Sequence, residues 1–318
     1  TVEKQDLASI TLHTTLTPVY NGFAQPVNLS DISKITVNGG EGTSISTTTP
    51  AGGGTPTSNV GKYFNLTSTS GVNAGDELTV TASADAIPDS PYKGSVSCTT
   101  KIAAKPFKTG DIVADVAAGL EYQYTGKAIT IPNDKITLKE SKKETESDNK
   151  LGGADLSAAI KDATIAEADA IPGNRVVTVN ANTEKLKNFK QDTDTTAGTP
   201  ATFNGEFTTT EKVTIKKRDL STNGTKIEMK YSNVPVGTTA DGLAKFLKFT
   251  GVEGTELKLA YTNSGAAGND YTIKVTKTKG SNGSEGSEVK TLDAAGTYNV
   301  IISANDTKGT CTGSQTLQ

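Results

Sequence analysis

The sequence is poor in the residues that carry most enzyme chemistry. Its 318 residues include no Trp, one Met (Met229), one His (His13) and two Cys (Cys98 and Cys311). A nucleophile–base pair needs a basic partner such as His, and no Gly-x-Ser-x-Gly turn is present to expose a nucleophilic serine. Zinc needs a cluster of His and Cys, which this inventory does not supply. We therefore predict no enzyme activity, no catalytic residues and no cofactor, and we interpret His13 as an ordinary strand residue.

Two further motifs carry little chemistry. Gly52–Gly54 lacks the Lys and the strand–helix context of a phosphate-binding loop, and we interpret it as linker. Glu140, Glu144 and Glu146 fall in the charged run 139–150. We expect that run to be a solvated loop or hairpin rather than a source of paired carboxylates for glycoside cleavage. The two cysteines lie in different predicted domains, and we expect both to be unpaired thiols.

Long apolar runs and basic blocks are also missing. No segment approaches the ~18 apolar residues of a membrane-spanning helix. The net charge is −3, and Lys is mixed with Asp and Glu along the chain. We therefore predict no nucleic-acid partner and no membrane insertion. The sequence does not begin with Met and has no signal peptide, which we interpret as processing or as a section of a longer protein.

Among metals, calcium has the ligand requirement that this sequence comes closest to meeting. Asp76-Glu77, Asn133-Asp134 and Asn269-Asp270 place oxygen ligands near expected turns. Calcium needs six to eight oxygens, and none of these pairs lies in a run with the alternate spacing of a calcium loop. We interpret the pairs as turn formers, with calcium binding as the alternative.

What the sequence does contain favours an all-β fold. The hydrophobic fraction is only 34%, while Gly (32 residues), Thr and Ser are abundant. Small antiparallel sandwiches suit this composition, because only alternate residues of each strand face a core. A single large core does not suit it. Alternating apolar and polar residues argue against disorder for most of the chain.

A seven-residue segment occurs twice and organises the sequence. Thr214–Leu220 and Thr1–Leu7 share a Thr, a β-branched residue, three long polar residues and Asp-Leu, about 213 residues apart. We name this pattern the joint motif. Lys101–Lys105, followed by Gly110–Ile112, is the best candidate for a third, weaker copy. The spacing indicates a repeated architecture and predicts three domains: 1–106, 107–217 and 218–318.

Alternating residues predict the strands of these domains, and two segments predict short helical turns. The helical turns are expected at Ala154–Ala163 and Ala240–Phe249, where apolar residues share one face. The expected strands are Leu7–His13, Ile32–Val37, Glu77–Ala82, Ser95–Ile102, Ile136–Leu138, Arg175–Ala181, Glu206–Ile215, Lys226–Lys230, Glu256–Tyr261, Tyr271–Thr276 and Ala295–Ser303.

The third domain is expected to lack the end of its closing strand. In the first two domains that strand runs eight residues beyond a turn glycine, from Gly94 to Ile102 and from Gly205 to Val213. The same count from Gly313 passes the last residue. An incomplete closing strand leaves unpaired backbone groups at a sheet edge. We expect either a following segment or a partner to supply that strand, with Thr1–Leu12 of a neighbouring copy as the candidate donor.

Several motifs resemble the repeats of bacterial Ig-like surface domains. Those repeats carry a Tyr-x-Gly-Lys opening, an Ala-Gly-Thr-Tyr-x-Val strand and an aromatic-Thr-Gly turn, in that order. Here Tyr124–Ile129, Ala295–Ile301 and Cys311–Gly313 match them. Tyr20-Asn21-Gly22 keeps the opening in the first domain, whereas Tyr231-Ser232-Asn233 departs from it in the third.

This resemblance implies three tandem Ig-like antiparallel β-sandwiches on a bacterial cell surface. The expected function is a structural one: an extracellular stalk, filament, sheath or surface-layer subunit that self-associates and contacts the cell envelope. Two alternatives remain from other classes. One is an adhesin that binds a host protein or glycan, and the other is a decoration protein of a phage virion.

Overall fold

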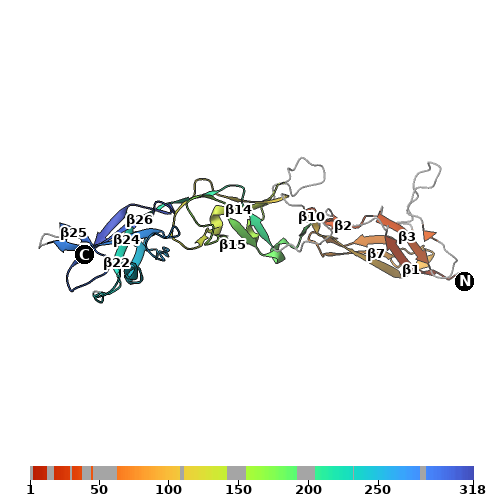
Figure 1. The fold of residues 1–318 in the computed structure, drawn as a ribbon. Coiled ribbons are helices and arrows are strands. Elements are labelled where there is room, and N and C mark those ends of the chain that lie inside the picture. The colour runs from red at the N-terminus through yellow and green to blue at the C-terminus, as the bar shows by residue number, and fades with distance from the viewer. Residues whose placement is uncertain are drawn as a thin grey trace. The chain divides into compact units, whose positions relative to one another are not determined.

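The computed structural model is all-β, with mostly antiparallel sheets and short 3-10 helices (Figure 1). Its contacts divide the chain into two compact units: unit 1 comprises 1–112, 139–159 and 182–205, and unit 2 comprises 113–138, 160–181 and 206–318. The structure describes residues 3–12, 18–28, 31–37, 44–45, 63–107, 111–141, 155–191, 205–231, 233–279 and 284–318.

Unit 1 contains a four-stranded sheet in the order β4-β3-β1-β8 and a three-stranded sheet in the order β5-β7-β9, with two short pairs, β2-β6 and β10-β18. Its strands and 3-10 helices are β1 (Gln5–Leu12), β2 (Gln25–Pro26), β3 (Ile32–Val37), β4 (Ser44–Ile45), β5 (Asn65–Ser68), β6 (Ser70–Gly71), β7 (Glu77–Ser83), β8 (Tyr92–Lys93), β9 (Ser95–Lys101), β10 (Lys105–Phe107), η3 (Ser157–Ala159), η4 (Thr183–Leu186) and β18 (Phe189–Gln191).

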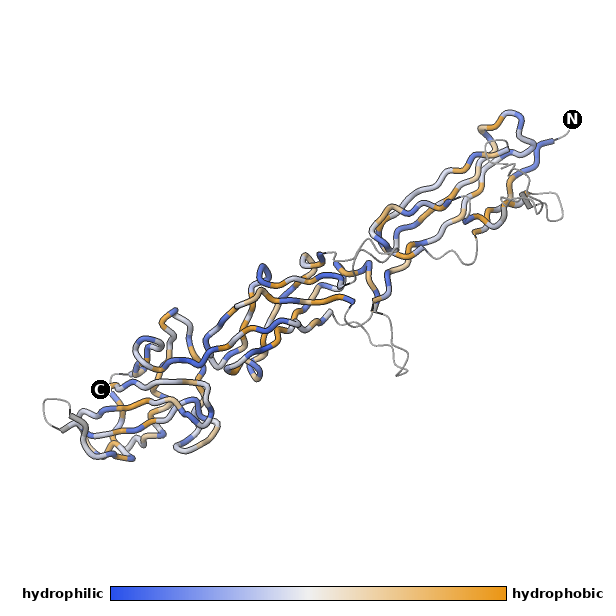
Figure 2. The backbone as a smooth tube through the Cα atoms, turned by 90° about the horizontal axis from the view of Figure 1, so that it is seen from above, coloured by the Kyte–Doolittle hydropathy of each residue, from blue (hydrophilic) through white to orange (hydrophobic). Residues whose placement is uncertain are grey.

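The core of unit 1 forms between its two larger sheets. Leu7 and Ile10 of β1, Ile35 of β3, and Leu78 and Val80 of β7 belong to one buried cluster. Successive side chains of a strand point to opposite faces, so the alternating sequence of β7 sends every second residue inward. Figure 2 shows the same alternation of apolar and polar residues along the chain. Two sheets sharing one core give this part of the protein a sandwich-like architecture.

The first part of unit 2 contains a three-stranded sheet, β12-β20-β16, and a four-stranded sheet, β13-β15-β17-β19. The strands β11 (Ile112–Val116) and β14 (Ile136–Glu140) each cross the division between the units. The remaining elements are β12 (Glu121–Gln123), β13 (Ile129–Thr130), η2 (Asn133–Lys135), β15 (Ile160–Ile165), β16 (Gly173–Arg175), β17 (Thr178–Ala181), β19 (Glu206–Thr208) and β20 (Val213–Lys216).

The second part of unit 2 contains a four-stranded antiparallel sheet, β25-β24-β26-β28, and two strand pairs, β22-β23 and β21-β27. Its elements are β21 (Arg218–Asp219), β22 (Thr225–Met229), η6 (Asp241–Phe246), β23 (Leu247–Gly251), β24 (Tyr271–Lys279), β25 (Ser284–Glu288), β26 (Tyr298–Ala304), β27 (Cys311–Thr312) and β28 (Ser314–Leu317). Both β22 and β28 are edge strands of their sheets.

Glycines at corresponding sequence positions share a positive φ. Gly94, Gly205 and Gly313, which precede the expected closing strands, have φ of 81°, 79° and 76°. Gly22 and Gly126 of the Tyr-x-Gly turns have φ of 79° and 71°. A positive φ is strained for residues with a Cβ atom, so glycine is required for these turns to form. The turn glycines that the sequence singles out therefore each occupy a position where glycine is favoured.

Many of the expected strands are confirmed. The segments expected at Ile32–Val37, Glu77–Ala82, Ser95–Ile102, Lys226–Lys230 and Tyr271–Thr276 correspond to β3, β7, β9, β22 and β24. In the first strand, β1 ends at Leu12, and His13 lies outside the described residues.

The expected strand Glu256–Tyr261 is wrong. Only Glu256 makes an isolated bridge. The N–H groups of the following residues donate to three different segments instead of one neighbouring strand: Leu257 donates to the carbonyl of Phe249 (3.0 Å), Lys258 to that of Thr125 (2.8 Å), and Ala260 to the side chain of Asp270 (2.5 Å). These backbone N–H groups are hydrogen-bonded without pairing to one neighbouring strand, so the alternation of residues alone wrongly predicts a strand here.

Other expected elements are shorter or divided. In the described part of Ala154–Ala163, residues 155–163, only η3 is helical, because Ile160 begins β15, which also contains the β-branched Thr164 and Ile165. In Ala240–Phe249 the helix ends at Phe246 and β23 begins. Arg175–Ala181 divides between β16 and β17, and Glu206–Ile215 between β19 and β20, because each segment moves from one sheet to another.

The three-domain division stays a prediction. The expected boundary after residue 106 falls inside β10, which pairs in parallel with β18. The expected boundary after residue 217 falls between β20 and β21, which are separated by Lys217 alone.

Candidate interaction site

The second copy of the joint motif is an ordered strand rather than a loose connector. In unit 2, β21 pairs in parallel with β27, so that Arg218 lies opposite Cys311 and Asp219 opposite Thr312. The N–H of Arg218 donates to the carbonyl of Thr310 at 3.0 Å. The joint motif is thus bound to the Cys-Thr-Gly turn, a segment that the sequence singles out separately.

Gly313 allows this close approach. A Cβ atom at Gly313 would lie 2.6 Å from Oδ1 of Asp219, and the positive φ also disfavours other residues. The same Oδ1 accepts a hydrogen bond from the N–H of Ser221 (2.9 Å), while Oδ2 accepts from the Ser221 hydroxyl (2.7 Å). The Asp of the joint motif therefore fixes the turn that follows it.

The first copy of the joint motif makes the same pairing in unit 1. Gln5 lies opposite Tyr92 and Asp6 opposite Lys93, again in parallel. The N–H of Gln5 donates to the carbonyl of Pro91 at 3.0 Å, and Lys93 lies 3.8 Å from the carboxylate of Asp6. The register is the same in both copies: the Asp of the motif lies opposite the residue that precedes the turn glycine.

The third, weaker copy is described only in part. Ala103 forms a parallel bridge with Val19, and Lys105 belongs to the parallel pair β10-β18. Gly110 lies outside the described residues, as do Phe203 and Asn204 of the corresponding turn.

Arg218 is the largest fully buried side chain in the described residues, with 2% exposure. Its Nε donates to the carbonyl of Tyr124 (3.0 Å), and its Nη1 donates to the carbonyl of Gly224 (3.4 Å). Nη1 and Nη2 also reach the two carboxylate oxygens of Glu253 at 3.2 and 2.8 Å. These hydrogen bonds from Arg218 hold the pKa of Glu253 below its usual value. The guanidinium ties the joint motif to two other segments of unit 2.

Asp270 is a fully buried carboxylate near this arginine, with 0% exposure. It accepts hydrogen bonds from the hydroxyl of Tyr124 (3.1 and 3.2 Å), the hydroxyl of Thr310 (2.6 Å) and the N–H of Ala260 (2.5 Å). Lys308 lies 2.7 Å from Oδ1. Burial, followed by the charge of Asp270, raises the pKa of Tyr124 well above its usual value. A buried charge with several partners of this kind holds its surroundings in one arrangement.

The Tyr-x-Gly turn at Tyr124 is itself packed against the last part of the chain. The carbonyl of Thr125 accepts a hydrogen bond from the N–H of Lys258 (2.8 Å). A Cβ atom at Gly126 would lie only 1.8 Å from the carbonyl oxygen of Lys258. The Lys258 side chain pairs with Glu167 at 2.5 Å. The turn that the sequence identifies as an opening motif is therefore a contact element within unit 2.

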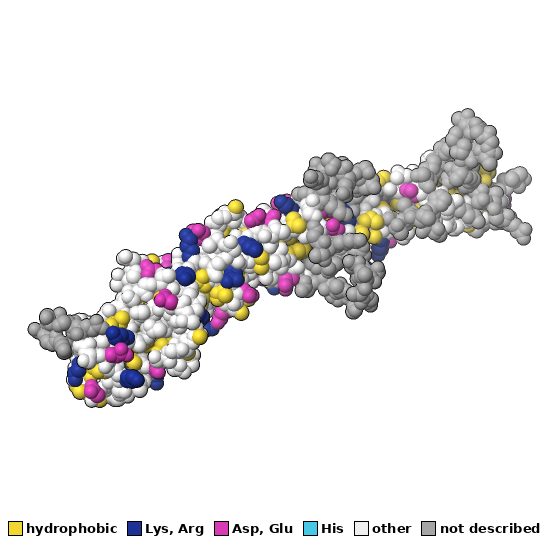
Figure 3. Space-filling model, turned by 45° about the horizontal axis from the view of Figure 1, so that its top comes forward, with side chains coloured by type: hydrophobic (Ala, Val, Ile, Leu, Met, Phe, Trp, Pro, Cys, Tyr) yellow, Lys and Arg dark blue, Asp and Glu magenta, His cyan; other side chains and the backbone are white. Residues whose placement is uncertain are grey.

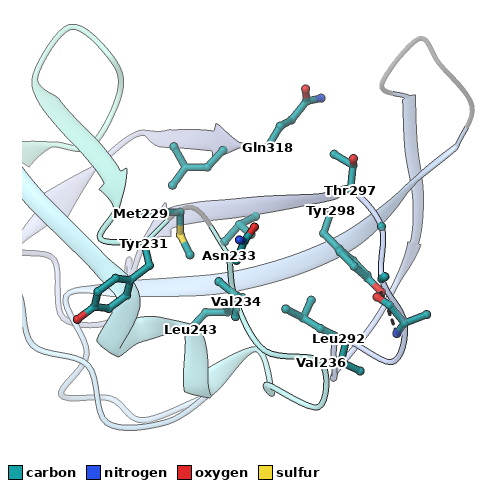
Figure 4. A pocket seen from close by; sticks show the side chains of 15 residues that line it. Met229, Tyr231, Asn233, Val234, Val236, Leu243, Leu292, Thr297, Tyr298 and Gln318 are labelled. Atoms are coloured by element: carbon teal, nitrogen blue, oxygen red, sulfur yellow. Dashed lines mark hydrogen bonds between the residues drawn. The ribbon is translucent and has the colours of Figure 1, made fainter.

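A groove lies elsewhere in unit 2, beside the edge strands β22 and β28. It has a volume of about 860 Å³. Met229 and Tyr231 line it on one side, residues 294–298 on another, and Leu317 and Gln318 at its rim. Figure 4 shows Met229 and Tyr231 across the hollow from Thr297 and Tyr298. Tyr231 is 63% exposed, which leaves the groove with an accessible aromatic wall.

Two of the three calcium alternatives form turns, as expected. Asp76 accepts hydrogen bonds from the N–H groups of Val72 (2.9 Å) and Asn73 (2.8 Å), and backbone donation from Asn73, then Val72, lowers its pKa. Asp134 lies in η2, 3.0 Å from Lys135.

Among the described residues, no group of three or more His, Cys, Asp or Glu side chains could hold a metal ion. In the third pair, Asn269 and Asp270 are buried, and the partners given above for Asp270 are protein atoms. Calcium binding stays an untested alternative.

The expectation of a solvated Glu140 is wrong. Glu140 ends β14, is buried, and accepts a hydrogen bond from Nζ of Lys105 at 2.5 Å. It follows Ile136 and Leu138 at alternate positions, so the strand carries it to the inward face. Glu144, Glu146, His13 and Gly52–Gly54 lie outside the described residues. Both Cys98 and Cys311 are free, as expected, and Cys311 is buried.

Sequence reasoning did not identify the buried Arg218 or the partly buried Lys308, and it interpreted Asp270 as a turn former rather than as a buried carboxylate. One signal could have found the first of them. Among the 32 basic residues only Arg175 and Arg218 are arginines, and Arg218 lies inside the repeated motif. Arginine is favoured over lysine where several fixed hydrogen bonds must form in a buried setting.

No protein-family model matches this chain, and no curated protein sequence does either. Within the described residues there is no helix with the length and apolar character needed to span a membrane. On the face drawn in Figure 3, basic and acidic side chains are interspersed rather than gathered by sign.

Proposed function

We propose that this chain is a structural subunit of a bacterial exterior, such as a filament, sheath, stalk or surface layer. In this proposal it consists of three consecutive Ig-like β modules and has no enzymatic role. Its work is mechanical: the joint motifs set each module against the next, and copies of the chain associate with one another.

The observation that carries the proposal is the repeated parallel pairing of the joint motif. Gln5-Asp6 and Arg218-Asp219 bind the residues before Gly94 and Gly313 in the same register. A catalytic site would not require the same connection twice. A chain of similar modules does require it, because each module must enter its fold in the same way.

Buried charges at the second joint support a mechanical role for this connection. Arg218 bonds to the backbone of Tyr124, and Tyr124 bonds through its hydroxyl to Asp270. Interactions between neighbouring modules are commonly small and polar, and such modules move relative to one another. Buried, multiply bonded charges resist that motion, because separating them leaves a charge without its partners.

The bacterial and extracellular parts of the proposal come from the resemblance to Ig-like surface repeats. The motifs that carry it are Tyr124–Ile129, Ala295–Ile301 and Cys311–Gly313. The scarcity of Cys, His and Met agrees with an exported, oxidation-exposed structural protein.

Force spectroscopy on a single chain, pulled from its two ends, tests this proposal. Three modules of similar size would unfold in three events, each releasing roughly 350 Å for ~100 residues at about 3.5 Å per residue. One event releasing the whole length, or extension without any force peak, would contradict it. Specific binding of the unpulled monomer to a glycan array would favour the adhesin alternative instead.

A further inference from the structure

The opening and closing segments of the first part of unit 2 lie side by side and run in the same direction. Glu121–Gln123 of β12 pairs in parallel with Thr214–Lys216 of β20. A parallel bridge between Ala114 and Thr209 joins the same two stretches of chain farther back. Between them the chain forms β13, β15 and β17 of a second sheet. An early and a late strand of this part of the chain are therefore paired with each other.

Backbone hydrogen bonds connect the two strands at both ends of this pairing. The N–H of Thr214 donates to the carbonyl of Leu120 at 3.0 Å. The N–H of Tyr124 donates to the carbonyl of Lys216 at 2.9 Å. The side chain of Arg218 adds a further link, because its Nε donates to the carbonyl of Tyr124 at 3.0 Å. The two segments are thus joined over the whole length of the pairing and one residue beyond it.

The closing strand is anchored from its other side. β20 is the central strand of the sheet β12-β20-β16, and Ile215 lies opposite Gly173 of β16. Val213 and Ile215 are 0% and 2% exposed. Burial of an apolar side chain of this size contributes about 1.5–3 kcal/mol. β20 is therefore fixed to the core, whereas β12 is an edge strand that only its pairing with β20 holds in this sheet.

The direction of two paired strands decides how they respond to tension. If the two strands are pulled from opposite ends of the pairing, the force runs along both strands and strains all the bonds between them together. If they are pulled from the same end, the bonds are strained and broken one after another. A single hydrogen bond contributes only about 0.5–1.5 kcal/mol to stability. A short pairing therefore resists force well in the first geometry and poorly in the second.

Tension along this chain strains the pairing in the first geometry. It reaches β12 through the residues before Leu120 and leaves β20 through the residues after Lys216. Because the two strands are parallel, these points lie at opposite ends of the pairing. An antiparallel pair of entering and leaving strands would place both points at the same end, where the bonds open singly.

Unit 1 has the same arrangement. Tyr20 of the Tyr-x-Gly turn donates its N–H to the carbonyl of Ala103 at 2.9 Å. Tyr124, in the corresponding turn of unit 2, makes the same bond to Lys216. The parallel pairs of unit 1 are Gln5 with Tyr92, Asp6 with Lys93, and Val19 with Ala103. A segment near the start of unit 1 thus also runs beside a later one in the same direction.

In unit 2 the pairing leads directly into another parallel pair. β20 ends at Lys216, and β21 begins two residues later at Arg218, which pairs in parallel with β27. The guanidinium of Arg218 bonds to the carbonyl of Tyr124, while its N–H donates to the carbonyl of Thr310 at 3.0 Å. Force that leaves the first pair therefore reaches the next without a free stretch of chain.

We infer that segments 120–124 and 214–218 form a shear clamp, a parallel pairing that makes this part of the protein much stronger against tension along the chain than against peeling of the same bonds. The inference deepens the proposed mechanical function and rests on it for the source of the tension. The directional strength itself follows from the strand directions alone.

The test pulls the full 318-residue chain by two engineered cysteines at a time, in a Cys98→Ser, Cys311→Ala background. Ala118→Cys with Lys217→Cys applies force at opposite ends of the clamp. Ala118→Cys with Lys212→Cys applies it at the same end. Positions 118, 212 and 217 are exposed, so the handles do not disturb the core. The two variants unfold nearly the same stretch of chain and differ mainly in the direction of force on the clamp.

We expect the unfolding force at equal pulling rate to be at least about twofold higher for the 118/217 pair, because several bonds of similar strength must break together. Chemical denaturation of the two variants should give the same midpoint, which shows that the difference comes from direction and not from stability. Equal forces in the two geometries, or a higher force for the 118/212 pair, would overturn the inference.

A pair of proline substitutions tests the bonds of the clamp. Thr214→Pro removes the N–H that donates to Leu120 and should lower the force of the 118/217 pair. Gln123→Pro is the matched control, since Gln123 lies between Tyr122 and Tyr124 on an edge strand and its N–H points away from β20. A folded Thr214→Pro chain whose force equals that of the control contradicts the clamp, and the comparison of handles decides alone if that chain does not fold.

Failure of the clamp is distinguishable from failure of the proposed function. The proposed function predicts how many unfolding events occur when the chain is pulled from its two ends, whereas the clamp predicts the ratio of forces between two pairs of handles. Three events together with equal forces in the two geometries would contradict the clamp alone. A single event from the ends, with the force ratio as expected, would contradict the three-module organisation alone.

Discussion

At the scale of single residues, unit 2 is held by charged groups that are rarely buried. Arg218 and Asp270 are among the least exposed residues of the chain, and both share Tyr124 as a partner, one through its carbonyl and the other through its hydroxyl. Burial of a charge is unfavourable unless its hydrogen bonds are replaced. The hydrogen-bond partners of Arg218 and Asp270 replace the hydrogen bonds that these side chains would otherwise make to water.

Removal of the buried carboxylate should therefore be severe. Asp270→Ala leaves Lys308, the Tyr124 hydroxyl and the Thr310 hydroxyl without their acceptor. We expect the free energy of unfolding of unit 2 to fall by about 3–5 kcal/mol in chemical denaturation. Asp306→Ala, at an exposed position in the same unit, should change it by no more than ~0.5 kcal/mol. Equal effects of the two substitutions would contradict the structural role of Asp270.

The thiol of Cys311 provides a test that depends on pH. Burial, followed by the charge of Asp270, raises the pKa of Cys311 to about 12. An unfolded thiol has a pKa near ~8.5. Between these values the folded chain keeps a proton that the unfolded chain releases, so unfolding becomes easier as pH rises above ~8.5 and is unaffected below it.

In a Cys98→Ser chain, where Cys311 is the remaining thiol, we expect almost no labelling by a disulfide reagent at pH 8.5 and full labelling in denaturant. The denaturation midpoint should be lower at pH 10 than at pH 7.5. Rapid labelling of the folded protein, or a midpoint that rises with pH, would show that this thiol is not buried as described.

At the scale of elements, alternation of apolar and polar residues is a good guide where a strand stays in one sheet. In β7 the residues Leu78, Val80 and Ala82 are buried as the pattern predicts. The same rule places Glu140 on the inward face of β14, where composition had suggested a solvated loop. The alternation of apolar residues and the high local charge predict different environments for Glu140. The alternation predicts the observed one, and burial of the carboxylate is possible because Lys105 supplies a countercharge.

Alternation fails where a strand changes partners. Arg175–Ala181 and Glu206–Ile215 each read as one strand, but each contributes to two sheets. The pattern of side chains continues across the break, while the hydrogen bonds go to different neighbours. Glu256–Tyr261 shows the extreme case, since its backbone donors reach three separate segments. The strand with which a segment pairs depends on residues far away in the sequence, so a short stretch of sequence does not predict it.

The candidate groove was not visible in the sequence. Counting from turn glycines predicted that the strand after Gly313 is shorter than those after Gly94 and Gly205, but β28 has four residues while β19, the strand after Gly205, has three. The residues opposite this strand, such as Met229 and Tyr231, have no sequence pattern that marks them as walls of one groove. Their juxtaposition follows from strand topology.

At the scale of the whole molecule, the joint motif belongs to two sets of strands at once. Thr214–Lys216 ends β20, and Arg218-Asp219 forms β21, with Lys217 alone between them. Boundaries between modules usually fall in exposed linkers with few contacts. Here the segment is ordered on both sides of Lys217, so under the proposed three-module organisation we expect neighbouring modules to influence each other's stability.

Hydrogen–deuterium exchange across Thr214–Leu220 tests this account most directly. The N–H groups of Thr214, Arg218 and Leu220 donate to the carbonyls of Leu120, Thr310 and Thr312 at 3.0, 3.0 and 2.8 Å. We predict that these amides exchange as slowly as those of the central strand β26. Exchange at the rate of an open loop would show that the segment is a simple polar connector, and the account of ordered joints would be wrong.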